Sequence, residues 1–385
     1  MRFDLTEDQK EIKKAIAELT DKYIAPGADE LDRESRYPEE NLKLLAQQGY
    51  MGMTFPETLG GIGADFVAYT ICIEEISRGC ASTGVIFEVH QSLAGWPILY
   101  YGTEEQKQKF IPKMATGEML GAFALTEPGA GSDAASIRTQ AVKDGDHYVL
   151  NGRKCFISGS GKAGLYVVIA YTNKEAGSRG MSAFLVEAGT PGLGYGKPED
   201  KMGIRASTTA DLILEDVRVP ARNLLGKEGD GFKIALSTLD GGRIGIAAQA
   251  VGIARAAYEK ARDYALKREQ FGKPIASFQA IQWMLADMAT DIEAAQLLTY
   301  RAAYLKQTGA RFSKEAAMAK LFASRMAVHH TSQALQIHGG YGYMREYQVE
   351  RHMRDAKITE IYEGTSEVMR LVISAQILKE AGAGR

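Results

Sequence analysis

One glutamate stands where a general base could work. Glu363 lies in the segment ITEIYEGTSEVMRL, residues 358–371, after the apolar Ile361 and the aromatic Tyr362 and directly before Gly364. The glycine marks a break between two predicted helices, where a carboxylate among apolar neighbours would be poorly solvated. Desolvation raises the pKa of a glutamate from about 4.3 towards the range of a useful base. A solvated glutamate at a helix end is the alternative.

A glycine-containing turn could bring backbone close to a large ligand. In ALTEPGAGSDAAS, residues 124–136, Gly129 and Gly131 have no side chains to block such an approach. Thr126 and Ser132 add hydroxyl donors for carbonyl or phosphate oxygens. Taken alone, the segment could equally be a structural turn.

A second glycine-rich segment interrupts a helical pattern near the C-terminus. In QIHGGYGYMREYQVERHMRD, residues 336–355, Gly339, Gly340 and Gly342 fall inside a helix of an otherwise regular bundle. Glycine costs about 1 kcal/mol at each helical position, which favours a close backbone contact with a ligand or another subunit.

Motifs for other chemistries are absent. The sequence has no GxxxxGK[ST] loop, no GxSxG elbow and no HExxH spacing among its six histidines, so we expect no metal site. The nearest approach to a dinucleotide fingerprint is GAGSDA at 129–134. Its continuation, IRTQAV, has the pattern of a strand rather than the required helix, which disfavours a nicotinamide domain.

Composition narrows the class of protein further. The 385 residues carry 46 Lys and Arg against 48 Asp and Glu, a net charge of −2, and 45% are hydrophobic. This length predicts two or three domains, and the absence of a basic run argues against nucleic-acid binding. No stretch of about 18 apolar residues occurs, so we expect no membrane insertion. Three scattered cysteines and a first segment with the pattern of a helix rather than a leader predict a cytoplasmic protein.

The chain has three successive regions with different patterns of hydrophobic residues. Residues 1–120 have helical spacing, residues 121–230 contain short β-rich runs, and residues 231–385 carry long amphipathic rows. We expect a small antiparallel β domain in the middle, with hairpin-type connections at 144–146 and at Asn151–Gly152. The rows after residue 230 predict an antiparallel bundle, whose third helix starts after a capping Ser313.

Together, the glycine-containing segments and the Glu363 segment resemble the acyl-CoA dehydrogenase family, most closely its short-chain, butyryl-CoA type. The similarity runs from residue 3 to 380 and includes TLDGGRIGIAAQAVGIA at 238–254 and KREQFGKPIASFQAIQ at 267–282. The resemblance implies an α+β multidomain fold with an N-terminal helical domain, a middle β-barrel and a C-terminal four-helix bundle. It also implies FAD and an acyl-CoA bound between the domains, in a homotetramer built as a dimer of dimers.

The resemblance also implies roles for residues by their position. Glu363 corresponds to the catalytic base, and Gly242 stands where another branch of the family carries its base. The residues at cofactor-binding positions are Phe123, Leu125, Thr126, Gly131, Ser132, Phe156, Ser158, Arg268, Phe271, Gln279, Gln336, Gly339, Gly340, Thr365 and Glu367. Among them, Arg268, Phe271, Gln279, Gln336 and Gly340 match residues that hold the adenosine half of the cofactor from a neighbouring subunit. The residues at substrate positions are Ser132, Asp240, Arg243, Tyr362 and Gly364.

The implied reaction is α,β-dehydrogenation of a short-chain acyl-CoA to the trans-2-enoyl-CoA. Glu363 would take the α-proton, flavin N5 the β-hydride, and an electron-transfer flavoprotein the electrons. Glu88, His90 and Gln91 lie where the family closes the acyl pocket and are polar, which leaves open a branched, cyclic or polar acyl group. Enoyl-CoA reduction and an electron-bifurcating partner also stay open. An acyl-CoA oxidase would usually need a further helical domain, and a non-catalytic scaffold would not explain Glu363 with the glycine segments.

Overall fold

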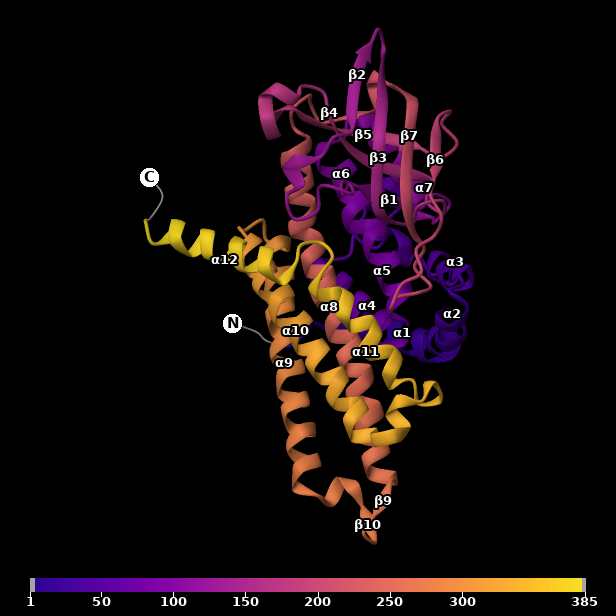
Figure 1. Cartoon of the computed structure of the whole chain (residues 1–385), viewed down its shortest axis with the longest axis vertical. Coiled ribbons are helices and arrows are strands. Elements are labelled where there is room, and N and C mark those ends of the chain that lie inside the picture. Colours follow the sequence, from indigo (N-terminus) through magenta and orange to yellow (C-terminus); the bar gives the residue numbers. More distant parts are fainter. Residues whose placement is uncertain (1–3, 383–385) are drawn as a thin grey trace.

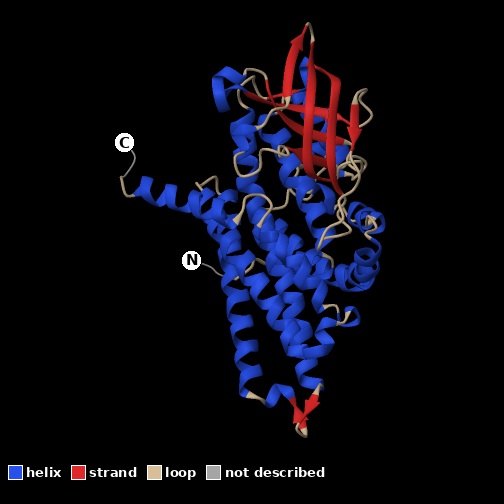
Figure 2. Cartoon of the chain, in the orientation of Figure 1, coloured by secondary structure: helices blue, strands red, loops and turns tan. Residues whose placement is uncertain are grey.

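The computed structural model describes residues 4–382. Residues 1–3 and 383–385, the outer ends of the two expected helical domains, lie outside the described residues. A β-sheet caps one end of the long axis, helices make up most of the rest, and a short two-stranded ribbon lies at the opposite end (Figures 1 and 2). None of the helices in the described range is long and apolar enough to cross a bilayer.

The N-terminal part is helical, as expected. Its helices are α1 (Glu7–Leu19), α2 (Ala28–Glu34), α3 (Glu39–Gln47), α4 (Phe66–Gly79), α5 (Ala81–Val89), α6 (Trp96–Tyr101) and α7 (Glu104–Ala115). Thr6 and Thr103 begin α1 and α7 with capping boxes, in which the threonine hydroxyl accepts from a first-turn amide. Every residue of α5 is buried, so this helix runs through the core.

The middle part is one curled sheet. Its strands are β1 (Gly121–Ala124), β2 (Gln140–Asp144), β3 (His147–Ser158), β4 (Leu165–Tyr171), β5 (Met181–Glu187), β6 (Leu193–Tyr195), β7 (Thr209–Pro220) and β8 (Leu224–Leu225). The hydrogen-bonded order is β6-β7-β3-β2-β4-β5-β8, with β1 beside β4. Tyr148, Tyr166, Phe184 and Leu212, from four different strands, share one core, which gives the sheet its barrel-like form.

Two expectations for the sheet were wrong. It is not purely antiparallel, because β1 and β2 both pair with β4 in parallel. The turn at 144–146 does connect β2 to β3, but Asn151 and Gly152 lie inside β3 at an irregularity in its pairing with β7. A Cβ at Gly152 would lie 2.3 Å from Thr139 Oγ1, so the glycine allows close strand packing and makes no turn.

The C-terminal part is the expected bundle. It consists of α8 (Gly231–Lys267), α9 (Gln279–Gln307), α10 (Ser313–His338) and α11 (Val349–Lys357), and α12 (Ser366–Glu380) follows. A two-stranded ribbon, β9 (Glu269–Gln270) and β10 (Lys273–Pro274), joins α8 to α9 at the end opposite the sheet (Figure 1). The apolar row of α8 is buried at Ile244, Ala247, Val251, Ala254 and Ala261. Helix α12 projects away from the body.

Two local expectations for the bundle need correction. The Ser313 hydroxyl caps no amide of α10 and donates instead to Asp240 Oδ2. Gly339, Gly340 and Gly342 do not interrupt a helix, because α10 ends at His338 and Gly339, with φ of 60°, turns the chain. Gly342 does pack closely, since its Cβ would lie 2.4 Å from the Leu335 carbonyl oxygen.

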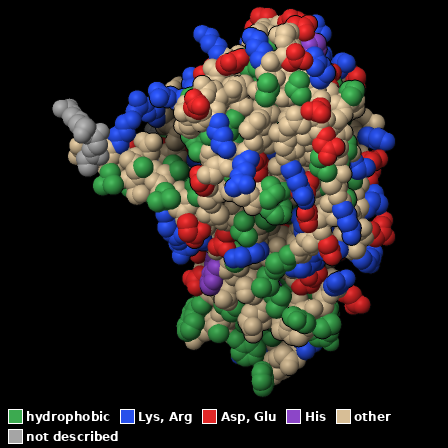
Figure 3. Space-filling model, turned by 45° about the horizontal axis from the view of Figure 1, so that its top comes forward, with side chains coloured by type: hydrophobic (Ala, Val, Ile, Leu, Met, Phe, Trp, Pro, Cys, Tyr) green, Lys and Arg blue, Asp and Glu red, His purple; other side chains and the backbone are tan. Residues whose placement is uncertain are grey.

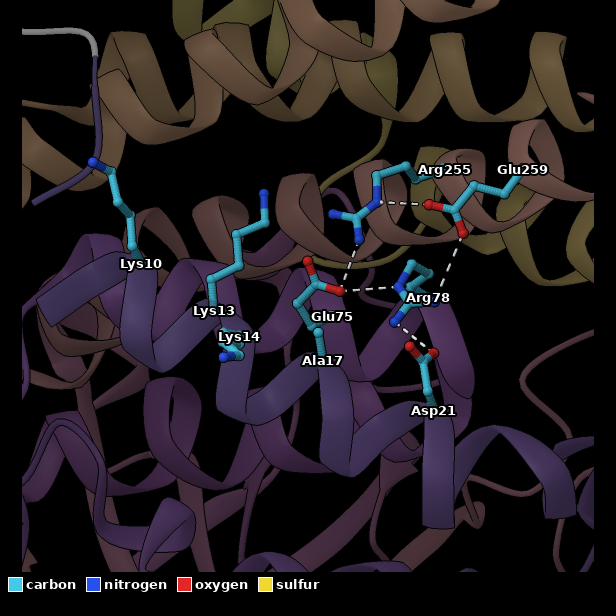
Figure 4. A pocket seen from close by; sticks show the side chains of 9 residues that line it. All are labelled: Lys10, Lys13, Lys14, Ala17, Asp21, Glu75, Arg78, Arg255 and Glu259. Carbon is cyan, nitrogen blue, oxygen red and sulfur yellow. Dashed lines mark hydrogen bonds and ion pairs between the residues drawn. The ribbon is translucent and has the colours of Figure 1, made fainter. Parts of the chain in front are cut away.

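A network of buried charges ties the N-terminal helices to the bundle. Glu75 on α4 accepts from Arg78 at 2.9 Å and from Arg255 of α8 at 2.7 Å. Arg78 also donates to Asp21, and Arg255 lies 3.4 Å from Glu259 (Figure 4). These opposite charges satisfy one another across a surface hollow that is also lined by Lys10, Lys13 and Lys14. The network therefore links α4 to α8, which also pack directly against each other.

Candidate active site

The backbone at Glu363 has an uncommon conformation. Glu363 has φ of 53° and Gly364 has φ of 105°, and residues other than glycine rarely adopt such positive φ values. The turn ends where Thr365 begins α12, its hydroxyl accepting from the Val368 amide at 3.3 Å. The Glu363 amide donates no hydrogen bond to any other described residue. The Glu363 amide is thus a free backbone donor beside the carboxylate.

A buried lysine holds this turn from the opposite side. Lys320 of α10 has no exposed surface and donates to the carbonyl oxygens of Tyr362, at 2.8 Å, and of Gly364. The ammonium group therefore binds the two peptides that flank Glu363. Burial lowers the pKa of Lys320 to about 8, and the charge of Glu363 opposes that change.

An arginine from α8 completes the polar surroundings. Arg243 is 5% exposed, forms an ion pair with Asp240 and reaches the Glu363 carbonyl oxygen with Nε at 3.5 Å. The Tyr362 hydroxyl donates to Gln249 of the same helix. The structure thus brings together all the predicted substrate residues except Ser132, which lies on the exposed turn after β1.

The carboxyl group of Glu363 is enclosed, and the residue of α8 that faces it is a glycine. A Cβ at Gly242 would lie 2.1 Å from Glu363 Oε2 and 2.8 Å from Leu93. Burial raises the pKa of Glu363 to about 7, while a hydrogen bond with Glu88 and the charges of Lys320 and Arg243 act in the opposite direction. A carboxyl with this pKa can accept a proton near neutral pH.

The three polar residues of the segment 86–96 have different surroundings. His90 accepts from the Gly121 amide at Nδ1, so Nε2 carries the proton and donates to the Met114 carbonyl oxygen at 3.0 Å. Gln91 accepts from the Thr54 amide at 3.0 Å. Both side chains therefore connect secondary-structure elements and are satisfied within the protein. Glu88 differs, because its carboxyl group lies against Glu363.

The predicted flavin residues lie on two segments joined by hydrogen bonds. Phe123 and Leu125 are buried, Thr126 is half-buried, and the Thr126 carbonyl oxygen accepts from the Cys155 amide at 2.9 Å. Phe156 follows with φ of 56° and 66% of its surface exposed, and Ser158 ends β3. A large apolar ring held outward by its backbone suits contact with a flat ligand.

A buried ion pair fixes the turn between these segments. Lys154 has no exposed surface and donates to Glu127 at 2.7 Å and to the Leu125 carbonyl oxygen at 3.0 Å. Glu127 also accepts from the amides of Arg138 and Thr139. Beyond this anchor, Cβ atoms at Gly129 and Gly131 would meet nothing within 4 Å. The exposed turn with Ser132 is therefore a rigid, open cradle that can approach a phosphate closely.

The remaining predicted cofactor residues lie in two other places. Thr365 and the exposed Glu367 begin α12 next to Glu363. Arg268, Gly339 and Gly340 line a hollow of about 420 Å³ together with Tyr264 and Tyr341, at the bundle end opposite the sheet. Exposed residues at the same end of the bundle include Phe271, Gln279 and Gln336. Along α8, the helical rise of about 1.5 Å per residue separates Gly242 from Arg268 by about 39 Å.

Several supporting residues were not predicted. Lys320 stands in AAMAKLFA, a lone charge inside an apolar row, and that position could have indicated a buried cation. Glu127 and Lys154 are 27 residues apart, and no local signal connects them. Within residues 4–382, no group of His, Cys, Asp and Glu has a geometry that could hold a metal ion.

Comparison with known proteins agrees with this fold. Sequence models of the acyl-CoA dehydrogenase N-terminal, middle and C-terminal domains match residues 6–118, 122–217 and 229–378. The chain is 50% identical to the short-chain specific acyl-CoA dehydrogenase of Clostridium acetobutylicum, over 98% of this chain and 100% of that protein.

Two solved structures share the fold over the same extent. Butyryl-CoA dehydrogenase from Megasphaera elsdenii has a TM-score of 0.97 and 48% identity, and covers 98% of this chain and 100% of its own. A chain in a structure of the electron transferring flavoprotein of Acidaminococcus fermentans, studied for flavin-based electron bifurcation, has a TM-score of 0.97 and 52% identity, with the same coverage.

The fold is that of an oxidoreductase that acts on acyl-CoA thioesters. This chain belongs to the acyl-CoA dehydrogenase family, as its sequence predicted.

Proposed function

We propose that the enzyme dehydrogenates short-chain acyl-CoA thioesters between the α- and β-carbons, with Glu363 as the base that takes the α-proton. The observation that carries this proposal is the enclosed Oε2 of Glu363, which faces Gly242 of α8 and lies on the same residue as a free backbone amide. Burial raises the pKa of this carboxyl to about 7. The α-C–H of a thioester is a weak acid, so the negative charge that develops on the carbonyl oxygen needs a preorganised donor. The Glu363 amide is such a donor, since no other described residue uses it.

Neighbouring residues orient the base. Lys320 holds the peptides on both sides of Glu363, and Arg243 reaches its carbonyl oxygen. Because these contacts fix the backbone, the carboxyl and the amide keep their relative positions as the proton moves. Tyr362 and Gly364 border the substrate position in this proposal, and Asp240 fixes Arg243.

FAD fits the residues that the chain presents. Thr126, Phe156 and Ser158 would hold the flavin ring, and the open cradle with Gly131 and Ser132 would receive the pyrophosphate. The chemistry that FAD supplies when bound is acceptance of the β-hydride at N5 and transfer of the electrons to an electron-transfer flavoprotein. The similarity to a chain from an electron transferring flavoprotein structure supports this partner.

The proposed assembly is a homotetramer, a dimer of dimers. Arg268, Gly339 and Gly340 are too far from Glu363 to serve the same cofactor in one chain, so we assign them to the adenosine half bound by a neighbouring copy. Large exposed apolar residues gather at this end of the bundle, among them Phe271, Trp283 and Tyr343, at 93%, 64% and 77% exposure. Figure 3 shows hydrophobic side chains concentrated there.

The preference for a short acyl chain has support from the packing around Glu88. Phe66, Tyr69, Phe87 and Trp96 form a cluster of aromatic contacts, with Tyr69 5.4 Å from Trp96 and 5.7 Å from Phe87 between ring centres. This cluster fills space on the α4 and α5 side of the base, where a long chain would extend. The similarity to short-chain specific and butyryl-CoA dehydrogenases points the same way.

The location and domain limits are also proposals. Three buried free thiols, Cys72, Cys80 and Cys155, fit a reducing compartment and support the cytoplasm. Domain limits at 120/121 and 230/231 are supported by the start of β1 at Gly121 and of α8 at Gly231.

A panel of acyl-CoA esters tests the function directly. The FAD-loaded enzyme is mixed anaerobically with saturated thioesters of increasing chain length, with branched esters and with esters bearing hydroxyl groups, and flavin bleaching is recorded. We expect the fastest bleaching with linear chains of about four to six carbons. A preference for long linear chains would reject the substrate proposal, and a preference for branched or hydroxylated esters would replace it.

A further inference from the structure

A second carboxyl group lies beside Glu363 and has no role in the reaction described above. Glu88 of α5 has no exposed surface. Its Oε1 accepts from the Ser92 hydroxyl. Its carboxyl is close enough to Glu363 for the charge of Glu363 to raise the pKa of Glu88. Oε2 of Glu88 and Oε2 of Glu363 are both enclosed, and neither has a partner among the donor groups of the described residues. Two ionised carboxylates in this position would repel each other strongly.

Helix α8 provides matched space for both carboxyl groups. A Cβ at Gly242 would lie 2.1 Å from Glu363 Oε2, and one at Gly245, three residues later, would lie 2.4 Å from Glu88 Cγ. The two glycines therefore lie on the same face of α8, one below each carboxyl. Because a glycine faces each of the two acids, we infer that their close placement is a specific feature of this site.

We propose that Glu88 is a positioning residue for the base: it carries a proton and donates it to Glu363 Oε2, so that the two carboxyls share one proton before substrate binds. This assignment rests on the proposed role of Glu363. The bond would fix the rotamer of the base and leave its other oxygen free for the α-proton. After that proton is taken up, the pair holds two protons.

The surrounding charges favour placing the shared proton on Glu88. Arg243 of α8 and Lys320 of α10 both act on Glu363, while Asp240 is paired with Arg243. Within the described residues, Glu88 receives hydrogen bonds from the Ser92 hydroxyl at its carboxyl and from the hydroxyl of Tyr69 of α4, which donates to its carbonyl oxygen at 3.3 Å. Tyr362, on the loop of the base, donates to Gln249. Burial and the charge of Glu363 raise the pKa of Glu88 well above its usual value.

Two substitutions separate hydrogen bonding from packing. Glu88→Gln keeps the size of the side chain and an N–H donor, whereas Glu88→Leu keeps the volume and removes the donor. Loss of a hydrogen bond to a charged group raises the pKa of a carboxylate by about 1 to 2 pH units. Glu104→Gln, which changes an exposed glutamate on α7, is the matched control.

The first measurement needs no substrate. Infrared difference spectra of the FAD-loaded enzyme against the Glu88→Gln variant report the carboxylic acid C=O stretch as the pH is raised. We expect a protonated acid in the wild type at pH 8 that the Gln variant lacks and the Glu104→Gln control retains. Absence of this band from the wild type would overturn the proposal, whatever the substrate of the enzyme proves to be.

The second measurement is the pH dependence of anaerobic flavin bleaching by butyryl-CoA. The base must be ionised, so the rate should rise with pH and level off above about 7 in the wild type. Glu88→Gln should keep this midpoint, and Glu88→Leu should move it up by about 1 to 2 units, with about a tenfold or greater loss at pH 6 and recovery at pH 9. An unshifted midpoint in Glu88→Leu, or equal shifts in both variants, would contradict the proposal. No bleaching by the wild type would reject the proposed function and leave the infrared result to decide on Glu88.

Discussion

Two places along α8 have glycine-rich surroundings of opposite kinds. In the first half of the helix, Gly242 and Gly245 have no room for a Cβ, because the carboxyls of Glu363 and Glu88 fill the space. Beside its C-terminal end, Cβ atoms at Gly339 and Gly340 would meet nothing within 4 Å. The first centre is complete within one chain, and the second is an open surface. The difference teaches that this chain contains the proposed base with all its supports but only part of the proposed cofactor site.

We expect the largest effect from a substitution that fills the space occupied by the Glu363 carboxyl. Gly242→Ala would place a methyl group 2.1 Å from the present position of Glu363 Oε2, and the carboxyl would have to move. A displacement of about 1 Å in such a site can cost about 10²-fold in rate, so we expect a loss of that order in flavin bleaching by butyryl-CoA. Gly27→Ala, at a position with nothing within 4 Å, is the control and should keep the wild-type rate. An unchanged rate in Gly242→Ala would mean that the base works from elsewhere.

Removing the lysine beneath the turn should have the next largest effect. Lys320→Met leaves the carbonyl oxygens of Tyr362 and Gly364 without their donor, at a cost of about 1 to 3 kcal/mol for each buried group. It also removes a positive charge that lowers the pKa of Glu363, so the rate should require a pH higher than about 7. Unfolding in denaturant and the pH profile measure the two effects.

Lys314→Met on the same helix is the matched comparison for Lys320. Its ammonium forms an ion pair with Glu380 near the surface, and such pairs contribute about 0 to 1 kcal/mol. We expect little change in stability and no shift of the pH profile. Equal losses in the two variants would argue that Lys320 has no special relation to the turn.

Substitutions in the open hollow at the C-terminal end of α8 should weaken the affinity for FAD and leave the reaction at Glu363 unchanged. Arg268→Gln removes a charged donor whose hydrogen bond contributes about 1.5 to 3 kcal/mol, so FAD retention on dilution should weaken by about 10- to 100-fold. Arg262→Gln, on the exposed face of α8, should retain FAD as the wild type does. Sedimentation with flavin absorbance measures both cofactor and assembly. A fully loaded monomer of either protein would contradict the shared site.

The sequence predicted the order of helical, β and helical parts because their periodicities are local. It also singled out the Glu363 segment, the turn at 124–136 and the residues at 336–340, which the structure places at a half-buried turn, an open cradle and an open hollow. Lys320 and the Lys154–Glu127 pair escaped prediction because their partners are distant in the chain. The parallel pairing of β1 with β4 is also set by long-range packing. Glycine appears the same in sequence whether it is crowded, as at Gly242, or open, as at Gly340.

The most direct test of the account is the Glu363→Gln variant, loaded with FAD and mixed anaerobically with butyryl-CoA. Glutamine keeps the size of the side chain and cannot accept the α-proton, so we predict a loss of about 10² to 10⁴ in the rate of flavin bleaching. FAD content and binding of acyl-CoA should stay near those of the wild type, because the substitution keeps the size of the side chain and leaves the Glu363 backbone amide and the proposed cofactor residues unchanged. Bleaching at nearly the wild-type rate in this variant would show that another residue takes the proton.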